Sequence, residues 1–422
     1  MLPRRSTIAC LLVAVLSLAG CGGRGSNSKG DGGTNASQAT TAGTALTDSA
    51  DSSPATTQGA YQSAITDAVV DNADFDAFEE QITGLINQTG LPGASLLVVQ
   101  HGELIEQEAW LDYTLDTVVP IASASKWLTA ATIMTLVDEG LIALDEPIST
   151  YIPGAVGSRA GGITMRQLLS FTSGLVSEDD VPCVSDPTST LVECATTLAS
   201  LPLVHEPGEV FRYGGQHLYV AGAIAEVVTG VPYAELFRQR IAEPLGMAKT
   251  FFVQVDGSRY TDVTNTKPAA AAVTTLGDYG RFLEMITHGG VAPDGTRLLQ
   301  SATIAEMQTN QITEARYGNA APFRVKDESP YGLGEWLDWT NPDGSALVLS
   351  SDGSLGFRPW IDKQNDLFGV YLVKDDGSAA VDGNPTPDAD DANQVYVSGN
   401  WIFELVAEAL NNPLPKDKYP DR

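Results

Sequence analysis

The sequence Ile121-Ala122-Ser123-Ala124-Ser125-Lys126 decides how this chain is expected to fold and to react. Ser123 and Lys126 fit the pattern S-x-x-K at the start of an expected helix, residues 125–139, in which apolar residues repeat with a helical period. Residues three apart at a helix start face the same side, so the hydroxyl and the amine can touch. A desolvated lysine can be neutral near pH 7 and accept the hydroxyl proton. We therefore expect Ser123 to be a nucleophile and Lys126 its base.

A second match to S-x-x-K, Ser26-Asn27-Ser28-Lys29, shows that the pattern alone is weak evidence. It lies within residues 22–59, which are mostly Ser, Thr, Gly, Ala and Asn and offer almost nothing to bury. Ser123 instead follows the apolar stretch Val118-Val119-Pro120-Ile121 and opens a helix that we expect to be buried. The surrounding sequence therefore favours Ser123.

Strand patterns lie at both ends of the expected domain, and helical patterns fill its middle. The expected strands are residues 94–100, 104–110, 346–350, 355–361 and 367–373, and further helices are expected at residues 218–228, 275–285 and 400–410. Strands joined as a hairpin or a meander are antiparallel. The sequence therefore predicts an α+β fold, with one antiparallel sheet built from both ends, helices on its faces and a helical insert between.

Four segments together resemble the β-lactamase-related serine hydrolases, a family of class C β-lactamases, D-alanyl-D-alanine carboxypeptidases and certain carboxylesterases. They are residues 121–126, 141–153 (LIALDEPISTYIP), 164–175 (TMRQLLSFTSGL) and 243–247 (EPLGM). The resemblance covers about residues 80–410. It implies a β-lactamase/DD-peptidase-like antiparallel sheet flanked by helices, with an all-helical insert region. It also implies acyl transfer through an acyl-enzyme on Ser123, with no metal and no cofactor.

The second motif of this family, Y-x-N, corresponds to Tyr213-Gly214-Gly215, where Tyr213 lies 90 residues after Ser123. The resemblance implies that Tyr213 shares protons with the lysine and assists the leaving group. Gly215 replaces the asparagine, so the amide that would contact an acyl side chain is absent. Gln216 or His217 could compensate. The alternative for Tyr213 is an ordinary core tyrosine.

The third motif, K-T-G or H-x-G, corresponds to Ser351-Asp352-Gly353. Ser351 replaces the cation that binds an anionic substrate carboxylate in this family, and Asp352 stands at the hydroxyl position, where it would repel one. Gly353 fits the motif. The backbone N–H of Ser354 can still join that of Ser123 in an oxyanion hole, because this role needs only N–H groups.

Literal matches to the second and third motifs lie elsewhere in the chain. Tyr317-Gly318-Asn319 fits Y-x-N, but its distance from Ser123 is wrong and no buried helix is expected to follow it. His288-Gly289-Gly290 fits H-x-G, but it follows a helix in a glycine-rich turn. We expect His288-Gly289-Gly290 to be a loop, and we favour Tyr213 over Tyr317 as the catalytic tyrosine.

The N-terminal region has the pattern of an exported lipoprotein. Residues 1–20 combine a positive start with an apolar core and read as a signal peptide that ends in Leu18-Ala19-Gly20-Cys21, which resembles a lipobox. The resemblance implies a lipid on Cys21 and a location outside the cytoplasm, on the membrane of a bacterial cell envelope. We expect a disordered tether at residues 21–75, the catalytic domain at 76–412 and a tail at 413–422.

Cysteine usage and charge agree with export. Cys183 and Cys194 are expected to form a disulfide in an oxidising compartment. The net charge of -29 argues against nucleic acid as a partner. Residues 374–393 are rich in Asp, Gly and Pro, but their irregular ligand spacing favours a surface loop over a calcium site.

The expected function is that of a serine acyl hydrolase. The sequence contains no G-x-S-x-G and no H-E-x-x-H, which disfavours an α/β-hydrolase and a zinc protease. The departures at the second and third motifs favour an ester or a small amide as the acyl substrate. One alternative is a D-Ala-D-Ala carboxypeptidase or β-lactamase. The other is a non-catalytic envelope protein that binds a wall or penicillin-like ligand. Nothing in the sequence indicates an oligomeric state.

Overall fold

The structure is a computed structural model, and it describes residues 60–67, 69, 75–89, 91–155, 157–176, 181–186, 188–253, 265–319, 329–374, 402, 403 and 405–410. The chain divides into residues 1–55 and a compact unit, residues 56–422. The signal peptide, Cys21, the Ser26 motif, most of residues 374–393 and the tail lie outside the described residues. Within the described part, no single helix combines the length and apolar character of a membrane span, although the bent pair Gln216–Thr229 and Tyr233–Ala242 does so jointly.

A six-stranded antiparallel sheet forms the centre of the compact unit, in the order β2-β1-β11-β10-β9-β8. Its strands are β1 (Gly93–Gln100), β2 (Glu103–Leu111), β8 (Trp336–Thr340), β9 (Ala346–Ser350), β10 (Arg358–Asp362) and β11 (Leu367–Leu372). The two ends of the chain meet where β1 pairs antiparallel with β11 and Ser95 lies opposite Leu372. The predicted antiparallel sheet built from both ends is confirmed.

The strand boundaries differ from prediction near the third motif. The strand expected at residues 355–361 begins only at Arg358, because Gly356 adopts a φ of 92° and its N–H donates to the Gly353 carbonyl in a turn. The edge strand β8 was not predicted from the sequence. Its Trp-rich residues lie opposite β9 in an irregular register.

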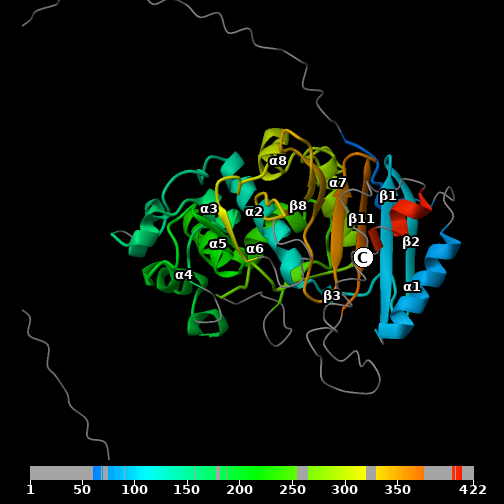
Figure 1. Ribbon diagram of the computed structural model, residues 1–422, viewed down its shortest axis with the longest axis horizontal. Helices are drawn as coiled ribbons and strands as arrows, with labels where there is room; N and C mark the ends of the chain where they lie inside the picture. The colour runs from blue at the N-terminus through cyan, green and yellow to red at the C-terminus, as the bar shows by residue number, and fades with distance from the viewer. Residues whose placement is uncertain are drawn as a thin grey trace, which may run out of the picture. The chain divides into compact units, whose positions relative to one another are not determined.

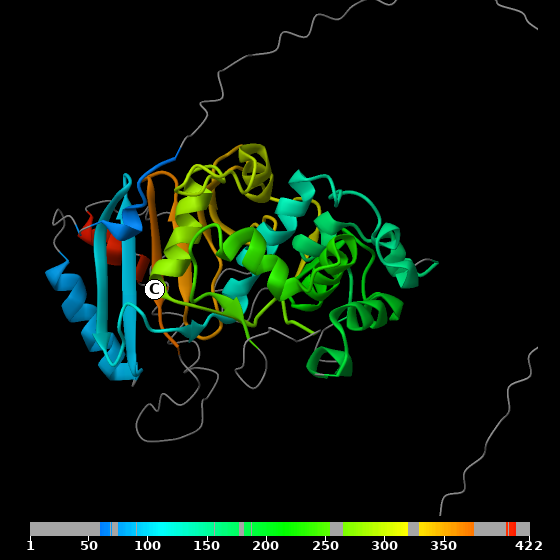
Figure 2. The same cartoon turned by 180° about the vertical axis from the view of Figure 1, so that it is seen from behind.

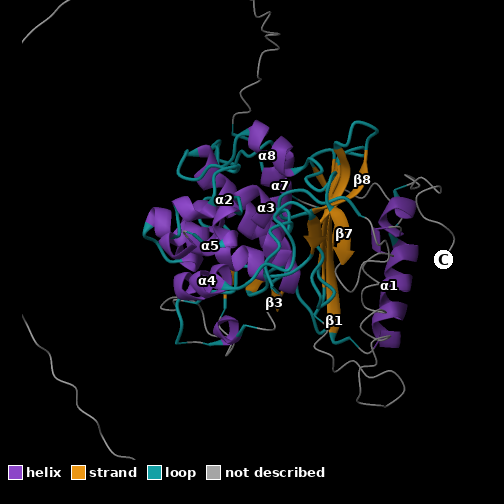
Figure 3. Ribbon diagram, turned by 60° about the vertical axis from the view of Figure 1, so that its left-hand side comes forward, coloured by secondary structure: helices purple, strands orange, loops and turns teal. Residues whose placement is uncertain are grey.

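Helices cover both faces of the sheet. α1 (Asp76–Thr89) and helical residues 402, 403 and 405–409 pack on one face, where Trp360 and Tyr371 join their apolar side chains in one cluster (Figure 1). α7 (Leu276–Thr287) lies across the other face, next to β11, β1 and β10 (Figure 2). Figure 3 shows the sheet with α1 on one side and the other labelled helices on the opposite side.

The helical region lies beyond α7 and contains the nucleophile helix. Its helices include α2 (Ser125–Asp138), α3 (Met165–Leu169), α4 (Leu191–Ser200), α5 (Gln216–Thr229), α6 (Tyr233–Phe237) and α8 (Ser301–Met307). α4 begins with a capping box in which Thr190 and Glu193 satisfy each other's backbone N–H groups. A disulfide joins Cys183 to Cys194 of α4, with a Cα–Cα distance of 5.3 Å.

Two small strand groups lie outside the main sheet. β3 (Val119–Pro120), β6 (Ala272–Thr274) and β5 (Phe251–Phe252) form an antiparallel sheet in the order β3-β6-β5. β4 (Val210–Arg212) pairs parallel with β7 (Arg316–Asn319), a pairing that the sequence did not suggest. The backbone of Asn319 thereby lies opposite Arg212, one residue before Tyr213, despite the wrong spacing along the chain.

Residues 60–67 differ from the expected tether, because they pack against α7. A short 3-10 helix, Ala64–Thr66, buries Ile65, and the Ser63 hydroxyl and the Ala64 N–H donate to the carboxylate of Glu284 over 2.6 Å and 2.7 Å. The Tyr61 ring stacks on His288 with the ring centres 3.7 Å apart. Residues 61–66, which the predicted disordered tether at 21–75 includes, are therefore packed against the domain.

We predict that deletion of residues 1–67 destabilises the domain far more than deletion of residues 1–59. The longer deletion exposes the apolar surface under Ile65 and removes two donors from the buried Glu284. The expected additional loss is roughly 2–4 kcal/mol in the free energy of unfolding, measured by urea denaturation. Equal stability of the two truncated chains would contradict the packing of this segment.

Candidate active site

Ser123 lies in a tight turn between a short strand and the start of α2. The turn is a 3-10 helix, Ala122–Ala124, and Ala122 adopts a φ of 43°, a left-handed conformation that costs energy for a residue with a side chain. The Ser125 hydroxyl donates to the Ala122 carbonyl over 2.6 Å and accepts the Ala272 N–H over 3.0 Å. Ser123 is therefore presented by a fixed and strained backbone.

Lys126 lies directly beside this turn, as the three-residue spacing predicts. Its Nζ is 2.9 Å from Ser123 Oγ and 3.0 Å from the Ala269 carbonyl oxygen. The side chain is only 4% exposed, because α2 is buried over most of its length. The amine is thus held within proton-transfer distance of the serine hydroxyl.

Tyr213 joins the pair from the end of β4. The Lys126 Nζ lies over its ring, 4.8 Å from the centre. The other side of the site is aromatic: Tyr213 stacks on Trp336 at 5.3 Å and meets Phe171 edge-on at 5.1 Å. The structure therefore brings Ser123, Lys126 and Tyr213 together, although 90 residues separate the first from the last.

Gly215 is the N-cap of α5, and the residues after it turn inward. Nδ1 of His217 lies 2.7 Å from the Ser173 hydroxyl and Nε2 lies 2.9 Å from the Arg212 carbonyl oxygen. Burial lowers the pKa of His217 to about 3, so the imidazole is neutral. Gln216 is also buried, and its Oε1 has no hydrogen-bond partner among the described residues. Internal contacts thus occupy His217, which does not stand in for the missing asparagine.

The third-motif residues form a buried loop after β9. Gly353 packs so closely that a Cβ there would be 2.2 Å from the Ile121 carbonyl oxygen, which ties the loop to the nucleophile turn. Its N–H donates to the Phe357 carbonyl over 2.8 Å. Ser351 is buried, whereas Ser354 is exposed at the following turn. The backbone of the loop, rather than a cation, therefore approaches the region of Ser123.

The sequence suggested that Asp352 would present an unpaired negative charge at this edge. The structure instead pairs its carboxylate with an arginine. Its Oδ1 lies 3.5 Å from the Arg358 guanidinium, and the same guanidinium lies 3.9 Å from Asp338. All three groups are largely buried, so Arg358 offsets part of the repulsion that Asp352 would exert on an anionic substrate. Because Asp352 and Asp338 together carry two negative charges, the single positive charge of Arg358 is fully offset.

Several residues of the site escaped sequence reasoning. Ala269 supplies only a carbonyl, and Trp336 and Arg358 lie far along the chain in strands whose pairing sets their positions. Tyr279 of α7 donates its hydroxyl to the Ala124 carbonyl over 3.0 Å. No motif marks these residues in the sequence.

Glu335 is a buried carboxyl behind the nucleophile helix. It follows Gly334, at which a Cβ would be 2.3 Å from Cβ of Ala130 and 3.1 Å from the Lys126 carbonyl oxygen. Neither Glu335 carboxyl oxygen has a hydrogen-bond partner among the described residues. Burial raises the pKa of Glu335 to about 8, and the charge of Lys363 only partly opposes this. The neutral acid is therefore the favoured form near pH 7.

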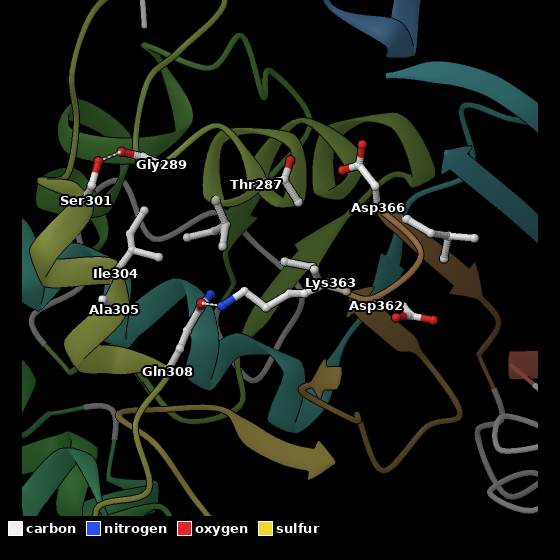
Figure 4. A pocket seen from close by; sticks show the side chains of 12 residues that line it. Thr287, Gly289, Ser301, Ile304, Ala305, Gln308, Asp362, Lys363 and Asp366 are labelled. Carbon is white, nitrogen blue, oxygen red and sulfur yellow. Dashed lines mark hydrogen bonds between the residues drawn. The ribbon is translucent and has the colours of Figure 1, made fainter. Parts of the chain in front are cut away.

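A separate hollow of about 340 Å³ lies between the end of α7, α8 and the turn from β10 to β11 (Figure 4). Its walls are partly apolar, and Lys363 Nζ crosses it to donate to Gln308 Oε1 over 2.6 Å. Asp362 and Asp366 also line it, so its charge is mixed. Ser123, Lys126 and Tyr213 are not among its lining residues, and the hollow is distinct from their site.

Comparisons with known proteins agree with the predicted family and fold. The family model described as Beta-lactamase matches residues 75–394. Penicillin-binding protein 4 of Amycolatopsis lactamdurans is 29% identical over 269 residues, covering 56% of this chain and 70% of that protein. Esterase EstB of Burkholderia gladioli is 32% identical over 199 residues, covering 42% of this chain and 50% of the esterase. A solved structure from Bacteroides dorei, of a protein proposed to be a beta-lactamase, superimposes with a TM-score of 0.71 at 31% identity, covering 81% of this chain and 100% of that one.

We predict that Gly353→Ala slows the reaction of Ser123 with a fluorophosphonate probe roughly tenfold, because displacing the loop or the turn by about 1 Å misplaces reacting groups. The added Cβ would meet the Ile121 carbonyl oxygen at 2.2 Å, so one of them must move. Gly162→Ala is the control, since nothing lies within 4 Å of a Cβ there. Equal labelling rates for the two variants would show that the close approach is unimportant.

We also predict a pH-dependent stability that originates at Glu335. Because its pKa is raised from 4.5 to about 8 in the folded state, the folded protein binds more protons in this range than the unfolded chain. The contribution of Glu335 to the free energy of unfolding therefore falls as the pH rises from about 4.5 to about 8. Glu335→Gln should flatten this dependence in urea denaturation, whereas Glu314→Gln at an exposed position should not. Parallel pH profiles for wild type and Glu335→Gln would refute it.

Proposed function

The chain belongs to the Beta-lactamase family of serine hydrolases, and from this premise we propose that it hydrolyses an uncharged ester or small amide through an acyl-enzyme on Ser123. The observation that carries the proposal is the 2.9 Å contact between Lys126 Nζ and Ser123 Oγ, beside the ring of Tyr213. This arrangement supplies a nucleophile, a base and a further proton carrier in one place.

The proposed reaction has two steps. In the first, Ser123 Oγ attacks the substrate carbonyl while the Lys126 amine accepts the hydroxyl proton. The carbonyl oxygen gains negative charge, which backbone N–H groups at Ser123 and Ser354 would stabilise. The bond to the leaving group then breaks, and the leaving group takes up the proton through Lys126 and Tyr213. In the second step, water gives a proton to the Lys126 amine and attacks the acyl carbonyl. The bond between the acyl carbon and Ser123 Oγ then breaks, the acid leaves, and Lys126 returns the proton to Ser123 Oγ.

The preference for an uncharged substrate rests on the charges around the site. Ser351 offers no cation where this family binds a substrate carboxylate, and Gly215 offers no amide. The nearby Arg358 already faces Asp352 and Asp338. A substrate carboxylate would therefore lose its hydration without gaining a free cation. The relative named Esterase EstB supports an ester as the substrate.

Two other functions remain as alternatives. The relative named Penicillin-binding protein 4 favours a D-Ala-D-Ala carboxypeptidase or β-lactamase. A non-catalytic protein that binds a wall or penicillin-like ligand would also be compatible with the departures at Gly215 and Ser351. The functions differ in turnover. An esterase releases product from an ester continuously, a peptidase forms a stable penicilloyl-enzyme, a β-lactamase hydrolyses penicillin continuously, and a binder reacts with neither an ester nor a penicillin.

The proposal includes an extracytoplasmic location on a membrane, through a lipid on Cys21. It is supported by the lipobox-like Leu18-Ala19-Gly20-Cys21 and by the polar stretch that follows. The disulfide between Cys183 and Cys194 is compatible with an oxidising compartment. Metabolic labelling with a palmitate analogue, compared between wild type and Cys21→Ala, tests this part.

We predict steady-state hydrolysis of p-nitrophenyl butyrate by the wild type, with kcat lowered at least about 10³-fold in Ser123→Ala and in Lys126→Ala because both act in one unit. Lys249→Ala is the control, since this exposed lysine forms an ion pair with the exposed Asp116. Release of p-nitrophenol is followed by absorbance, and benzylpenicillin is tested in parallel by intact-mass spectrometry. A stable penicillin adduct without ester turnover would favour the peptidase, and no reaction with either probe would favour the binder.

A further inference from the structure

The strained turn that carries Ser123 needs an external support. Ala122 adopts a φ of 43°, and such a conformation persists only where the surroundings determine it. Some supports come from the turn's near neighbours, such as the Ser125 hydroxyl between the Ala122 carbonyl and the Ala272 N–H. The Ala124 carbonyl, immediately after Ser123, is held from a different part of the chain.

That support is Tyr279, which reaches the turn from α7. Its hydroxyl donates to the Ala124 carbonyl over 3.0 Å, across 155 positions of sequence. The side chain is fully buried, and α7 is itself packed against the central sheet. The hydrogen bond therefore connects the nucleophile turn to the sheet through a rigid helix.

The same ring also contacts the loop of the third motif. Tyr279 meets Phe357 edge-on, with ring centres 5.0 Å apart. Phe357 accepts the Gly353 N–H through its carbonyl over 2.8 Å, and Gly353 packs against the Ile121 carbonyl. One side chain thus contacts both segments that would supply the oxyanion-binding N–H groups of Ser123 and Ser354.

The environment of Tyr279 keeps its hydroxyl as a donor. Burial, and then the charges of Glu335 and Asp352, hold the pKa of Tyr279 well above its ordinary value. The phenol therefore stays protonated at every pH at which the enzyme would work. A protonated hydroxyl can donate the hydrogen bond to the Ala124 carbonyl that stabilises the turn.

We propose that Tyr279 is a positioning residue for the acylation step: it does not touch the substrate, but it fixes the Ser123 turn relative to the Gly353 loop and so sets the separation of the two oxyanion-binding N–H groups. This inference rests on the proposed serine hydrolase function. It adds a residue from a helix that carries none of the three motifs. Its consequence is a loss of transition-state stabilisation, rather than of substrate binding, when the hydroxyl is removed.

The test compares Tyr279→Phe with Tyr233→Phe in the otherwise complete chain. Tyr233 is an equally buried tyrosine whose hydroxyl donates to Thr129 Oγ1 over 2.7 Å, on the same α2 helix but one turn beyond Lys126. Each variant therefore keeps its ring and loses a buried hydroxyl, which bonds to the turn before α2 in Tyr279 and to α2 in Tyr233. Melting temperature, kcat and KM for p-nitrophenyl butyrate, the rate of Ser123 phosphonylation by a fluorophosphonate, and the affinity for phenylboronic acid are measured for both.

The expected result is a similar drop in melting temperature for the two variants and a difference in chemistry. In Tyr279→Phe, kcat, the phosphonylation rate and the boronate affinity each fall about tenfold, with KM within about twofold of the wild type, as a small displacement of reacting groups would produce. In Tyr233→Phe these values stay at the wild-type level. Equal chemistry in the two variants would overturn the positioning role and leave the hydrolase function standing. A wild-type protein that fluorophosphonate does not label at Ser123 would instead overturn the proposed function and this inference together.

Discussion

A single buried amine organises the site of this protein. Lys126 is almost fully enclosed, and its Nζ is held between Ser123 Oγ, the Ala269 carbonyl and the face of Tyr213. Burying an amine is costly unless polar groups surround it, so each of these partners has to be delivered to within a few ångströms. The three come from a helix start, a loop before β6 and the end of β4. The packing of the helical region against the sheet brings these three partners to Lys126.

The central sheet provides the rigidity that this convergence requires. β1 and β11 pair across the two ends of the chain, and apolar clusters on both faces hold helices against the sheet. Because α7 lies on the face toward the helical region, it links the sheet to the nucleophile turn. Residues 60–67 extend this support by packing against α7 around Glu284. The stability of the fold and the geometry of Ser123 therefore depend on the same helix.

Charge decides what such a site can accept. The acyl-transfer groups are present, but Ser351 is neutral and Arg358 is shared by Asp352 and Asp338. Under the proposed function, a carboxylate-bearing substrate would find no surplus cation in this group, whereas a neutral acyl group would meet the aromatic surface around Tyr213. The groups for acyl transfer are thus kept in this chain, whereas the cation that binds an anionic substrate in this family is missing at Ser351.

The local sequence was sufficient for features that depend on neighbouring residues. The three-residue spacing placed Lys126 beside Ser123, the periodicity of α2, α5 and α7 marked them as helices, and short strand-like runs marked β1, β2, β9 and β11. The tertiary structure decided what depends on distant contacts. It fixed the edge strand β8, the late start of β10 after the Gly356 turn, and the parallel pairing that brings Asn319 beside Arg212. It also revealed the pairing of Asp352 with Arg358 and the hydroxyl of Tyr279 on the Ala124 carbonyl. Short-range patterns carry no information on which distant segment satisfies a buried carbonyl or charge, because that choice is made by the packing of the whole domain.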